Sequence, residues 1–224
     1  MTSADQARSQ PSRLVPIERP RQPSLAEQVR QRLSESIAAG SLLPGQLLVV
    51  DQLAGTLRVS KTPVREAFGT LLREGLIRQT ESGFRVAPLD AEYVREVYAV
   101  RSALESLLVE VIAADLSDQN LAALEAAARR ARPPDHDFHE LIRALCRWPF
   151  LNSLLDTISA HRARVRTLEL KESAMNNEVS YQEHLAILAA FKRRDGAAAR
   201  SLMQSHLDRL RDRVAYLAEQ DGMG

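Results

Sequence analysis

The pattern of apolar residues changes abruptly at Pro88-Leu89-Asp90. Beyond this point, apolar residues recur at helical spacing to the end of the sequence, with almost no strand signal. Chain-breaking residues divide this region into predicted helices near residues 90–114, 118–131, 135–147, 150–172, 178–194 and 196–219. A series of helices with short connections predicts an all-helical bundle over residues 89–224.

A different pattern precedes this boundary, over residues 24–88. A helix that starts with the capping box Ser24–Glu27 is followed by two shorter helical patterns, which are separated by a tight connection at residues 58–60. Two β-prone runs, Leu76–Thr80 and Phe84–Val86, then flank a turn and predict a small hairpin. The chain is therefore predicted to be mainly α, with a winged helix-turn-helix before the helical bundle.

The composition is that of a folded protein that stays inside the cell. The 224 residues are 45% hydrophobic and 26% charged, which is enough to bury a core. One cysteine excludes a disulfide framework and a cysteine-rich zinc module. The sequence has no long apolar run and no secretory signal, so a cytoplasmic protein without a membrane span is expected. Residues 1–23, rich in Ser, Gln, Arg and Pro, are expected to form a flexible leader.

The net charge of +1 hides two parts of opposite sign. Residues 1–88 hold 12 Lys and Arg against 8 Asp and Glu, a net of +4. Residues 89–224 hold 18 against 21, a net of −3. A nearly neutral total therefore does not exclude binding of a polyanion by the N-terminal part.

The third predicted helix turns its apolar residues to one side and leaves a polar face formed by Lys61, Thr62, Arg65 and Gly69. Lys and Arg reach phosphates and guanine edges, Thr supplies a compact donor, and Gly removes bulk near a groove wall. The turn at Ser82-Gly83 would place a wing beside the DNA backbone. The alternative is an ordinary solvated face, because Glu66 shares the same surface.

Three segments of this region resemble the GntR family of transcriptional regulators: LPG at 43–45, VSKTPVREA at 59–67 and EGLI at 74–77. They follow, in order, the family pattern PG…L…LA…L-V-S-R-T-P-V-R-E-A…L-x-x-E-G-L. The resemblance implies DNA contacts from the recognition helix and the wing at Ser60, Lys61, Thr62, Arg65 and Gly83. Lys61 replaces the usual Arg, which weakens bidentate reading of guanine, and Asp51 lies where some members place a basic or polar contact.

The bundle region holds all five histidines of the chain. Asp135 and His139 lie one helical turn apart and share a helix face, while His184 and His206 fall on the last two predicted helices. Three neutral imidazoles and one carboxylate suit zinc, nickel, manganese or iron, with positions left open for water or a ligand. The alternative for each histidine, taken singly, is a structural or surface role.

Three motifs of this region resemble the FCD ligand domain of the FadR subfamily of GntR regulators: VYAVRSALE at 97–105, D-x-x-F-H at 135–139, and an H-x-x-I-L…A…M-x-x-H-L ending that starts at His184. The resemblance implies a divalent metal ion, zinc or nickel first and manganese or iron next, on Asp135, His139, His184 and His206. It also implies that Arg101 pairs with the carboxylate of an effector. The alternative for Arg101 is an ion pair with Glu105, one turn on.

The chain departs from this pattern at two places. Arg147-Trp148-Pro149 replaces a Gly-Asn-Pro run that the family often has, and Trp148 is assigned to core packing rather than to a pocket wall or an interface. The segment 124–135 is short for the family, which indicates a trimmed second helix. Arg164 and Arg166 are weaker candidates for the effector pocket, and neither His136 nor His161 matches a ligand position of the family.

Together these features predict a metabolite-responsive transcriptional regulator. A homodimer is expected, since two-fold symmetry lets two heads read palindromic half-sites of operator DNA. Binding of a small organic acid is expected to change the spacing of the heads and to release a repressor from its operator. Two alternatives stay open: a metal-dependent enzyme that uses the Asp/His site, and a constitutive DNA-binding protein with a structural bundle.

Overall fold

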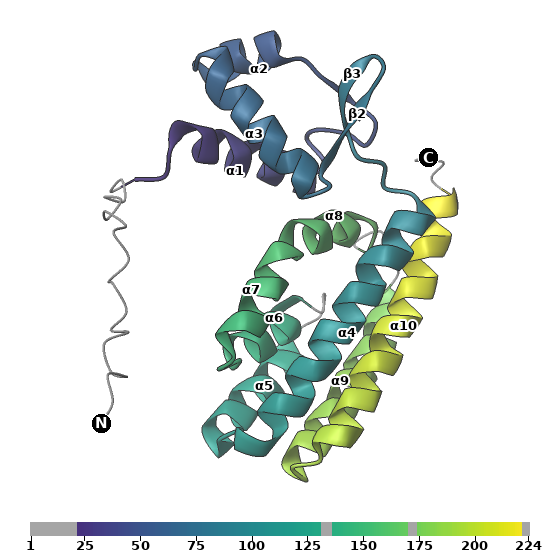
Figure 1. Cartoon of the computed structure of the whole chain (residues 1–224). Coiled ribbons are helices and arrows are strands. Elements are labelled where there is room, and N and C mark those ends of the chain that lie inside the picture. Colours follow the sequence, from purple (N-terminus) through teal and green to yellow (C-terminus); the bar gives the residue numbers. More distant parts are fainter. Residues whose placement is uncertain (1–21, 131–135, 170–173, 221–224) are drawn as a thin grey trace, which may run out of the picture.

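The computed structural model describes residues 22–130, 136–169 and 174–220, and these residues are mainly helical (Figure 1). They form a small N-terminal unit up to Pro88, called the head here, and a larger helical bundle after it. No helix within these ranges is long and apolar enough to cross a membrane. The predicted leader, residues 1–23, lies almost wholly outside the described residues.

Three helices make up most of the head. α1 (Leu25–Ala38) begins at Ser24, whose side chain accepts a backbone hydrogen bond as the capping box predicts. α2 (Val50–Leu57) and α3 (Lys61–Arg73) are joined by a turn in which Arg58 adopts the left-handed conformation, with φ 55°. The predicted helix-turn-helix is therefore present.

A three-stranded antiparallel sheet completes the head. β2 (Ile77–Thr80) and β3 (Gly83–Val86) form the predicted hairpin, and β1 (Leu47–Leu48) pairs with the outer side of β3. The sequence does not predict β1, because two residues are too few to show the alternation of a strand. The sheet is fixed to the helices by an edge-to-face contact between Phe84 and Phe68, with ring centroids 5.0 Å apart.

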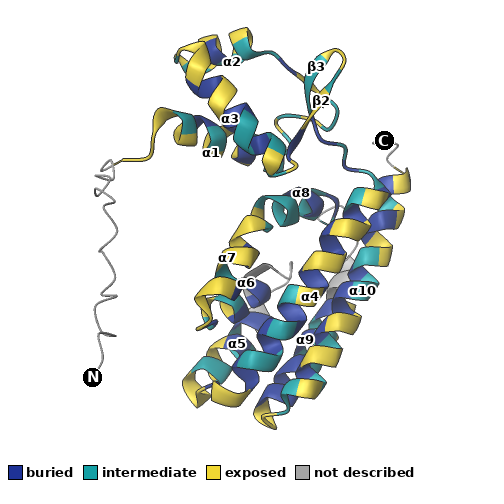
Figure 2. Cartoon of the chain, viewed as in Figure 1, coloured by how far each residue is buried: buried dark blue, intermediate teal, exposed yellow. Residues whose placement is uncertain are grey.

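The bundle is built around its two longest helices, α4 and α10, which pack along each other (Figure 1). α9 lies against α10 and α5, and the shorter helices α6, α7 and α8 lie along α4. Buried residues, dark blue in Figure 2, face the axis of the bundle. The helices are α4 (Ala91–Asp115), α5 (Asp118–Arg130), α6 (His136–Ala144), α7 (Pro149–Thr157), α8 (Ser159–Glu169), α9 (Ala174–Lys192) and α10 (Gly196–Gln220).

The prediction of one helix over residues 150–172 is wrong. The structure has α7 and α8 instead, with a break at Ile158. The hydroxyl groups of Thr157 and Ser159 donate to backbone carbonyls of the preceding turn, at 2.9 and 2.7 Å. Such side-chain bonds compete with the helical ladder and favour a bend, which the apolar periodicity does not reveal.

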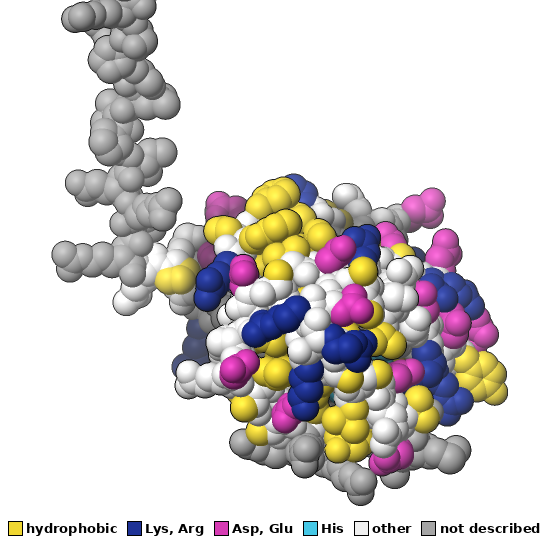
Figure 3. All heavy atoms as spheres, turned by 90° about the horizontal axis from the view of Figure 1, so that it is seen from below, with side chains coloured by type: hydrophobic (Ala, Val, Ile, Leu, Met, Phe, Trp, Pro, Cys, Tyr) yellow, Lys and Arg dark blue, Asp and Glu magenta, His cyan; other side chains and the backbone are white. Residues whose placement is uncertain are grey.

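The outer end of the bundle, away from the head, carries charges of both signs (Figure 3). Basic and acidic side chains are interspersed there with apolar ones. A surface of mixed sign has no strong field for a polyanion, so the basic head remains the candidate surface for nucleic acid.

α8 is the part of the bundle that contacts the head. It packs against α1, and Ala160 lies against the apolar core of the head. The connecting segment is anchored as well, because Leu89 is buried in the core of the bundle. The head is thus held by its linker and by one short helix.

Candidate nucleic-acid interface and metal centre

α3 presents the polar face that its sequence predicts. Its buried side is formed by Pro63, Val64, Ala67, Phe68 and Leu71. Ser60, Lys61, Thr62 and Arg65 are exposed on the opposite side. Ser60 occupies the N-cap position, yet its hydroxyl makes no capping bond to the helix. The start of α3 therefore offers free donors and the positive end of a helix dipole to an anion.

Lys61 and Asp51 form an ion pair between α3 and α2, with Nζ and Oδ2 2.8 Å apart. Both side chains are more than half exposed, at 55% and 65%. An exposed pair of this kind contributes about 0–1 kcal/mol and is readily exchanged for another partner. Asp51, which departs from the family pattern, thus holds the cation of Lys61 in this structure.

The wing turn requires a glycine. Gly83 has φ 116°, a conformation that side chains with a Cβ rarely adopt. The neighbouring Arg85 is held by the molecule itself, donating to the carbonyl of Gly45 at 2.9 Å and to the hydroxyl of Ser82 at 3.2 Å. The tip of the wing is therefore fixed and small, with a cation at its base.

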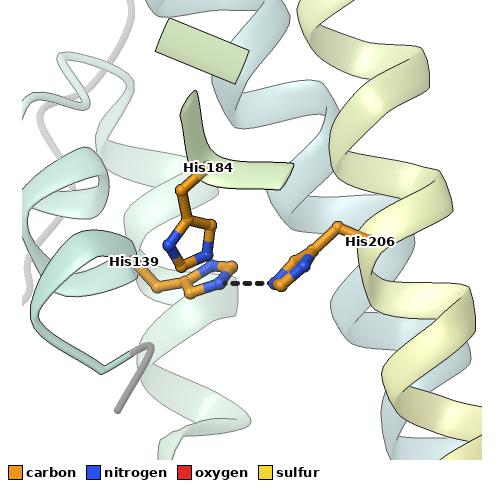
Figure 4. Close-up of side chains that lie close together, drawn as sticks. All are labelled: His139, His184 and His206. Carbon is orange, nitrogen blue, oxygen red and sulfur yellow. Dashed lines mark hydrogen bonds between the residues drawn. The ribbon is translucent and has the colours of Figure 1, made fainter. Parts of the chain in front are cut away.

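The bundle brings together three of the four predicted metal ligands. His139 of α6, His184 of α9 and His206 of α10 are all buried, and one nitrogen of each lies within 4.8 Å of the others (Figure 4). The Nε2 atoms of His139 and His206 are 3.2 Å apart. The fourth predicted ligand, Asp135, lies outside the described residues.

Two carboxylates fix the orientation of these rings. Glu105 of α4 lies 2.6 Å from Nδ1 of His139, and Glu183 of α9 lies 2.7 Å from Nδ1 of His206. Each Nδ1–H donates to a carboxylate, so each Nε2 is directed into the centre of the cluster. Sequence reasoning missed both carboxylates as partners of the cluster. The only signals were the position of Glu105 one turn after Arg101 and that of Glu183 just before His184.

The donor set fits a transition-metal ion. Burial lowers the pKa of His139 and of His184, although Glu105 partly opposes this at His139. These imidazoles are therefore neutral at physiological pH, which is the form that binds metal. Three convergent imidazoles with room for a further ligand suit zinc or nickel better than magnesium or calcium, which prefer oxygen.

A cavity of about 240 Å³ lies next to the cluster, between α4, α6 and α8. Its wall contains four arginines and two glutamates, namely Arg101, Arg143, Arg162, Arg166, Glu140 and Glu169. Arg101 is buried and donates to Glu105 at 2.9 Å and to Glu169 at 3.3 Å. The ion pair foreseen as the alternative for Arg101 is thus present, and the residue also faces the cavity.

Other candidate residues lie elsewhere. Arg166 lines the cavity, whereas Arg164 points to the linker and does not. His161 bonds to the hydroxyl of Tyr93 at 2.6 Å and takes no part in the cluster. Trp148 is 51% exposed, so its assignment to core packing is wrong: it sits at the N-cap position of α7, outside the buried faces of the helices. The side chain of His136 lies outside the described residues.

Comparison with known proteins agrees with both halves of the chain. Residues 25–86 match the family described as bacterial regulatory proteins, gntR family, and residues 96–209 match the FCD domain. The chain is 30% identical over 218 residues to the helix-turn-helix (HTH) transcriptional regulator BphR of Paraburkholderia xenovorans (strain LB400), covering 87% of this chain and 86% of BphR. It is 26% identical over 215 residues to the HTH-type transcriptional repressor RspR of Escherichia coli (strain K12), covering 90% of this chain and 93% of RspR.

The fold is also that of a solved structure, E. coli McbR/YncC. The TM-score is 0.65 at 23% sequence identity, and the match covers 89% of this chain and 99% of the other. At this identity the likeness concerns the fold alone. It extends over the head and the bundle together.

Proposed function

The chain belongs to the gntR family of bacterial regulatory proteins and carries an FCD domain after its DNA-binding head. We propose that it is a repressor that a small organic acid releases from its operator. It is a transcriptional regulator rather than an enzyme. The observation that carries the proposal is the buried cluster of three histidines next to an arginine-lined cavity, in the same chain as an exposed basic recognition helix.

The proposed DNA contacts are Ser60 at the N-cap of α3, Lys61, Thr62 and Arg65 of α3, and Gly83 of the wing. Their support is the exposure of the first four residues and the tight turn at Gly83. The lysine and the arginine reach phosphates or guanine edges in the major groove, while the wing approaches the minor groove. This interface would act in the cytoplasm, where operator DNA is found.

The proposed metal ligands are His139, His184 and His206, together with Asp135 from the segment before α6. A bound zinc or nickel ion would supply a Lewis-acidic position for an oxygen atom of the effector. The chain itself orients the rings of His139 and His206 through Glu105 and Glu183, and burial keeps His139 and His184 neutral. Arg101 and Arg166 would hold the carboxylate of the effector in the neighbouring cavity.

We propose further that two copies of the chain act together. One head contacts only a few base pairs, whereas two heads related by a two-fold axis read a palindromic site. The relative RspR is named a repressor, which supports the same sign of regulation here. An effector acts in such a dimer by favouring an arrangement of the heads that does not match the operator.

The test is an operator titration. DNA that the purified protein selects from a random-sequence library is labelled for fluorescence anisotropy, and small carboxylates that raise the melting temperature of the protein are added. We expect operator affinity to fall about tenfold or more, since allosteric coupling is typically about 1–3 kcal/mol. The double variant His184→Ala/His206→Ala should bind DNA equally well, contain less metal and not respond.

Two results would contradict this proposal. If a small organic acid stabilises the wild-type protein but leaves its operator affinity unchanged, the effector mechanism is refuted. Unchanged metal content and regulation in the double variant would instead favour a constitutive DNA-binding protein with a structural bundle. Light scattering of the purified protein tests the dimer separately.

A further inference from the structure

The two carboxylate oxygens of Glu105 contact different groups of residues. Its Oε2 lies 2.6 Å from Nδ1 of His139 in the histidine cluster. Its Oε1 accepts from Nε of Arg101 at 2.9 Å and lies 3.4 Å from Nε of Arg162. Both arginines line the cavity, so one carboxylate contacts both a histidine of the cluster and two residues of the cavity wall.

The other carboxylate of the cluster provides a contrast. Glu183 also accepts from a histidine, but its remaining partner is Arg209 on α10, at 2.6 Å. Arg209 in turn donates to Ser180 and does not line the cavity. Glu183 therefore orients a ring without a link to the cavity, whereas Glu105 contacts two arginines of the cavity wall.

The position of the Glu105 carboxylate is fixed by its buried partners. Glu105 is only 4% exposed, and a charge at such a site is tolerated only where it is paired. The partners of its carboxylate are nitrogen donors: Nδ1 of His139 at 2.6 Å, Nε of Arg101 at 2.9 Å and Nε of Arg162 at 3.4 Å. The side chain is thus a fixed anion between a ring and two guanidinium groups.

We propose that Glu105 is a positioning residue that couples the histidine cluster to the arginines of the cavity. By holding Nδ1 of His139 it directs Nε2 toward the metal position, and by holding Arg101 it ties the cavity wall to the same ring. This inference rests on the proposed function in taking the histidines as a metal site. It adds that metal affinity depends on an arginine that touches no histidine ligand.

The chemistry of a glutamine makes the proposal testable. In Glu105→Gln, the amide oxygen accepts from one side only, and the amide nitrogen then faces a donor on the other side. We expect Co²⁺, used as the probe metal, to bind about 10–100-fold more weakly, the usual effect of losing such a partner. The visible absorption spectrum of bound Co²⁺ should change as well, because the ring of His139 is no longer held.

A matched control lies on the same helix. Glu110 of α4 pairs with Arg200 on the surface, away from the cluster. Glu110→Gln should leave both the affinity and the spectrum of Co²⁺ unchanged. Should Glu105→Gln fail to fold, Glu105→Asp keeps the charge but cannot reach both partners, and it should show a smaller loss of the same kind.

A double-mutant cycle tests the coupling. Arg101→Lys keeps the charge but loses the Nε–H that holds Glu105, so Co²⁺ affinity should fall several-fold. In the Glu105→Gln background the same change should have no further effect, because the link is already broken. Additive effects of the two substitutions, or no effect of Arg101→Lys alone, would refute the coupling.

Co²⁺ binding by two variants distinguishes a failure of the proposed metal site from a failure of the proposed role of Glu105. If His184→Ala/His206→Ala binds Co²⁺ as the wild type does, the metal site itself is wrong. If that variant loses Co²⁺ while Glu105→Gln retains wild-type affinity and spectrum, the site stands and the role of Glu105 is refuted.

Discussion

The side chain of Arg164 in α8 donates a hydrogen bond of 2.7 Å to the backbone carbonyl of Ala87, the residue that follows the last strand of the head. It also donates to the carbonyl of Pro88 at 3.1 Å and to the hydroxyl of Tyr93 at 2.8 Å. Two residues before and after it, Arg162 and Arg166 line the cavity. One short helix therefore contacts both the arginine-lined cavity and the linker of the head.

Arg164→Ala should destabilise the protein and loosen the linker. The guanidinium is 2% exposed, and its removal leaves buried carbonyl groups without a donor and Tyr93 without its cation, 4.6 Å away. A loss of about 2–4 kcal/mol in the free energy of unfolding is expected. Denaturant titration measures it, and limited proteolysis should cut the linker faster. Arg166→Ala, in the same helix, is the control; equal stability of the two variants would contradict this role of Arg164.

The junction should also be sensitive to acid through His161. Burial lowers the pKa of His161, and the nearby charge of Arg164 acts in the same direction, while Glu74 opposes them. The unfolded chain therefore takes up the proton first, and stability should fall as the pH drops below about 6.5, the unfolded value, toward the folded pKa.

The measurement is chemical unfolding of the wild type and of His161→Gln at pH 7.5 and at pH 5.5. All other ionisable groups are the same in both proteins, so the difference between their losses of stability on acidification isolates His161. We expect the variant to lose less stability on acidification. An equal loss of unfolding free energy between pH 7.5 and pH 5.5 in the two proteins would show that His161 does not take up a proton on unfolding.

Local patterns of the sequence predict the elements of this protein well. The cap at Ser24, the recognition helix and the hairpin are all present, because each depends on neighbouring residues. The break at Ile158 is not predictable in this way, since it depends on two hydroxyl groups that bond back to the helix. β1 is not predictable from local sequence either, because the strand with which it pairs lies far along the chain.

The site shows the same division. Three histidines can be selected from motifs, whereas the carboxylates that orient them come from other positions and helices. Whether Arg101 pairs with Glu105 or faces a cavity is undecided by spacing, and it does both. Such double roles depend on how α4, α6 and α8 pack together, and the sequence pattern of a single helix does not reveal that packing.

Arg65→Ala should weaken operator binding without affecting the fold. The side chain is exposed on the recognition helix, and a base or phosphate contact of this kind is worth about 1–3 kcal/mol. Affinity should therefore fall between about fivefold and a hundredfold in an anisotropy titration, with an unchanged melting temperature. Arg73→Ala, at the end of the same helix that faces the bundle, is the control. Equal affinities of Arg65→Ala and wild type would refute the contact.

Asp51→Asn should strengthen DNA binding. The substitution removes the carboxylate that holds Lys61 at 2.8 Å and takes one negative charge from the DNA-facing surface. Because an exposed ion pair is worth up to about 1 kcal/mol, affinity should rise about two- to fivefold at low salt. The gain should shrink as salt is added, and it should be smaller in a Lys61→Gln background, where only the removal of the negative charge still acts. Weaker binding by Asp51→Asn would show that Asp51 itself makes a favourable contact.

Gly196→Ala should destabilise the bundle because the glycine lies directly against another backbone. A Cβ at this position would stand 2.8 Å from the carbonyl oxygen of Glu110, closer than the two helices allow. The resulting shift of α10 against α4 is expected to cost about 1–3 kcal/mol. Gly55→Ala is the matched control, since Gly55 lies in a helix with open space around it and alanine should stabilise that helix by about 0.5–1 kcal/mol. Thermal unfolding should therefore move the two melting temperatures in opposite directions, and a stabilised Gly196→Ala variant would show that α4 and α10 do not approach this closely.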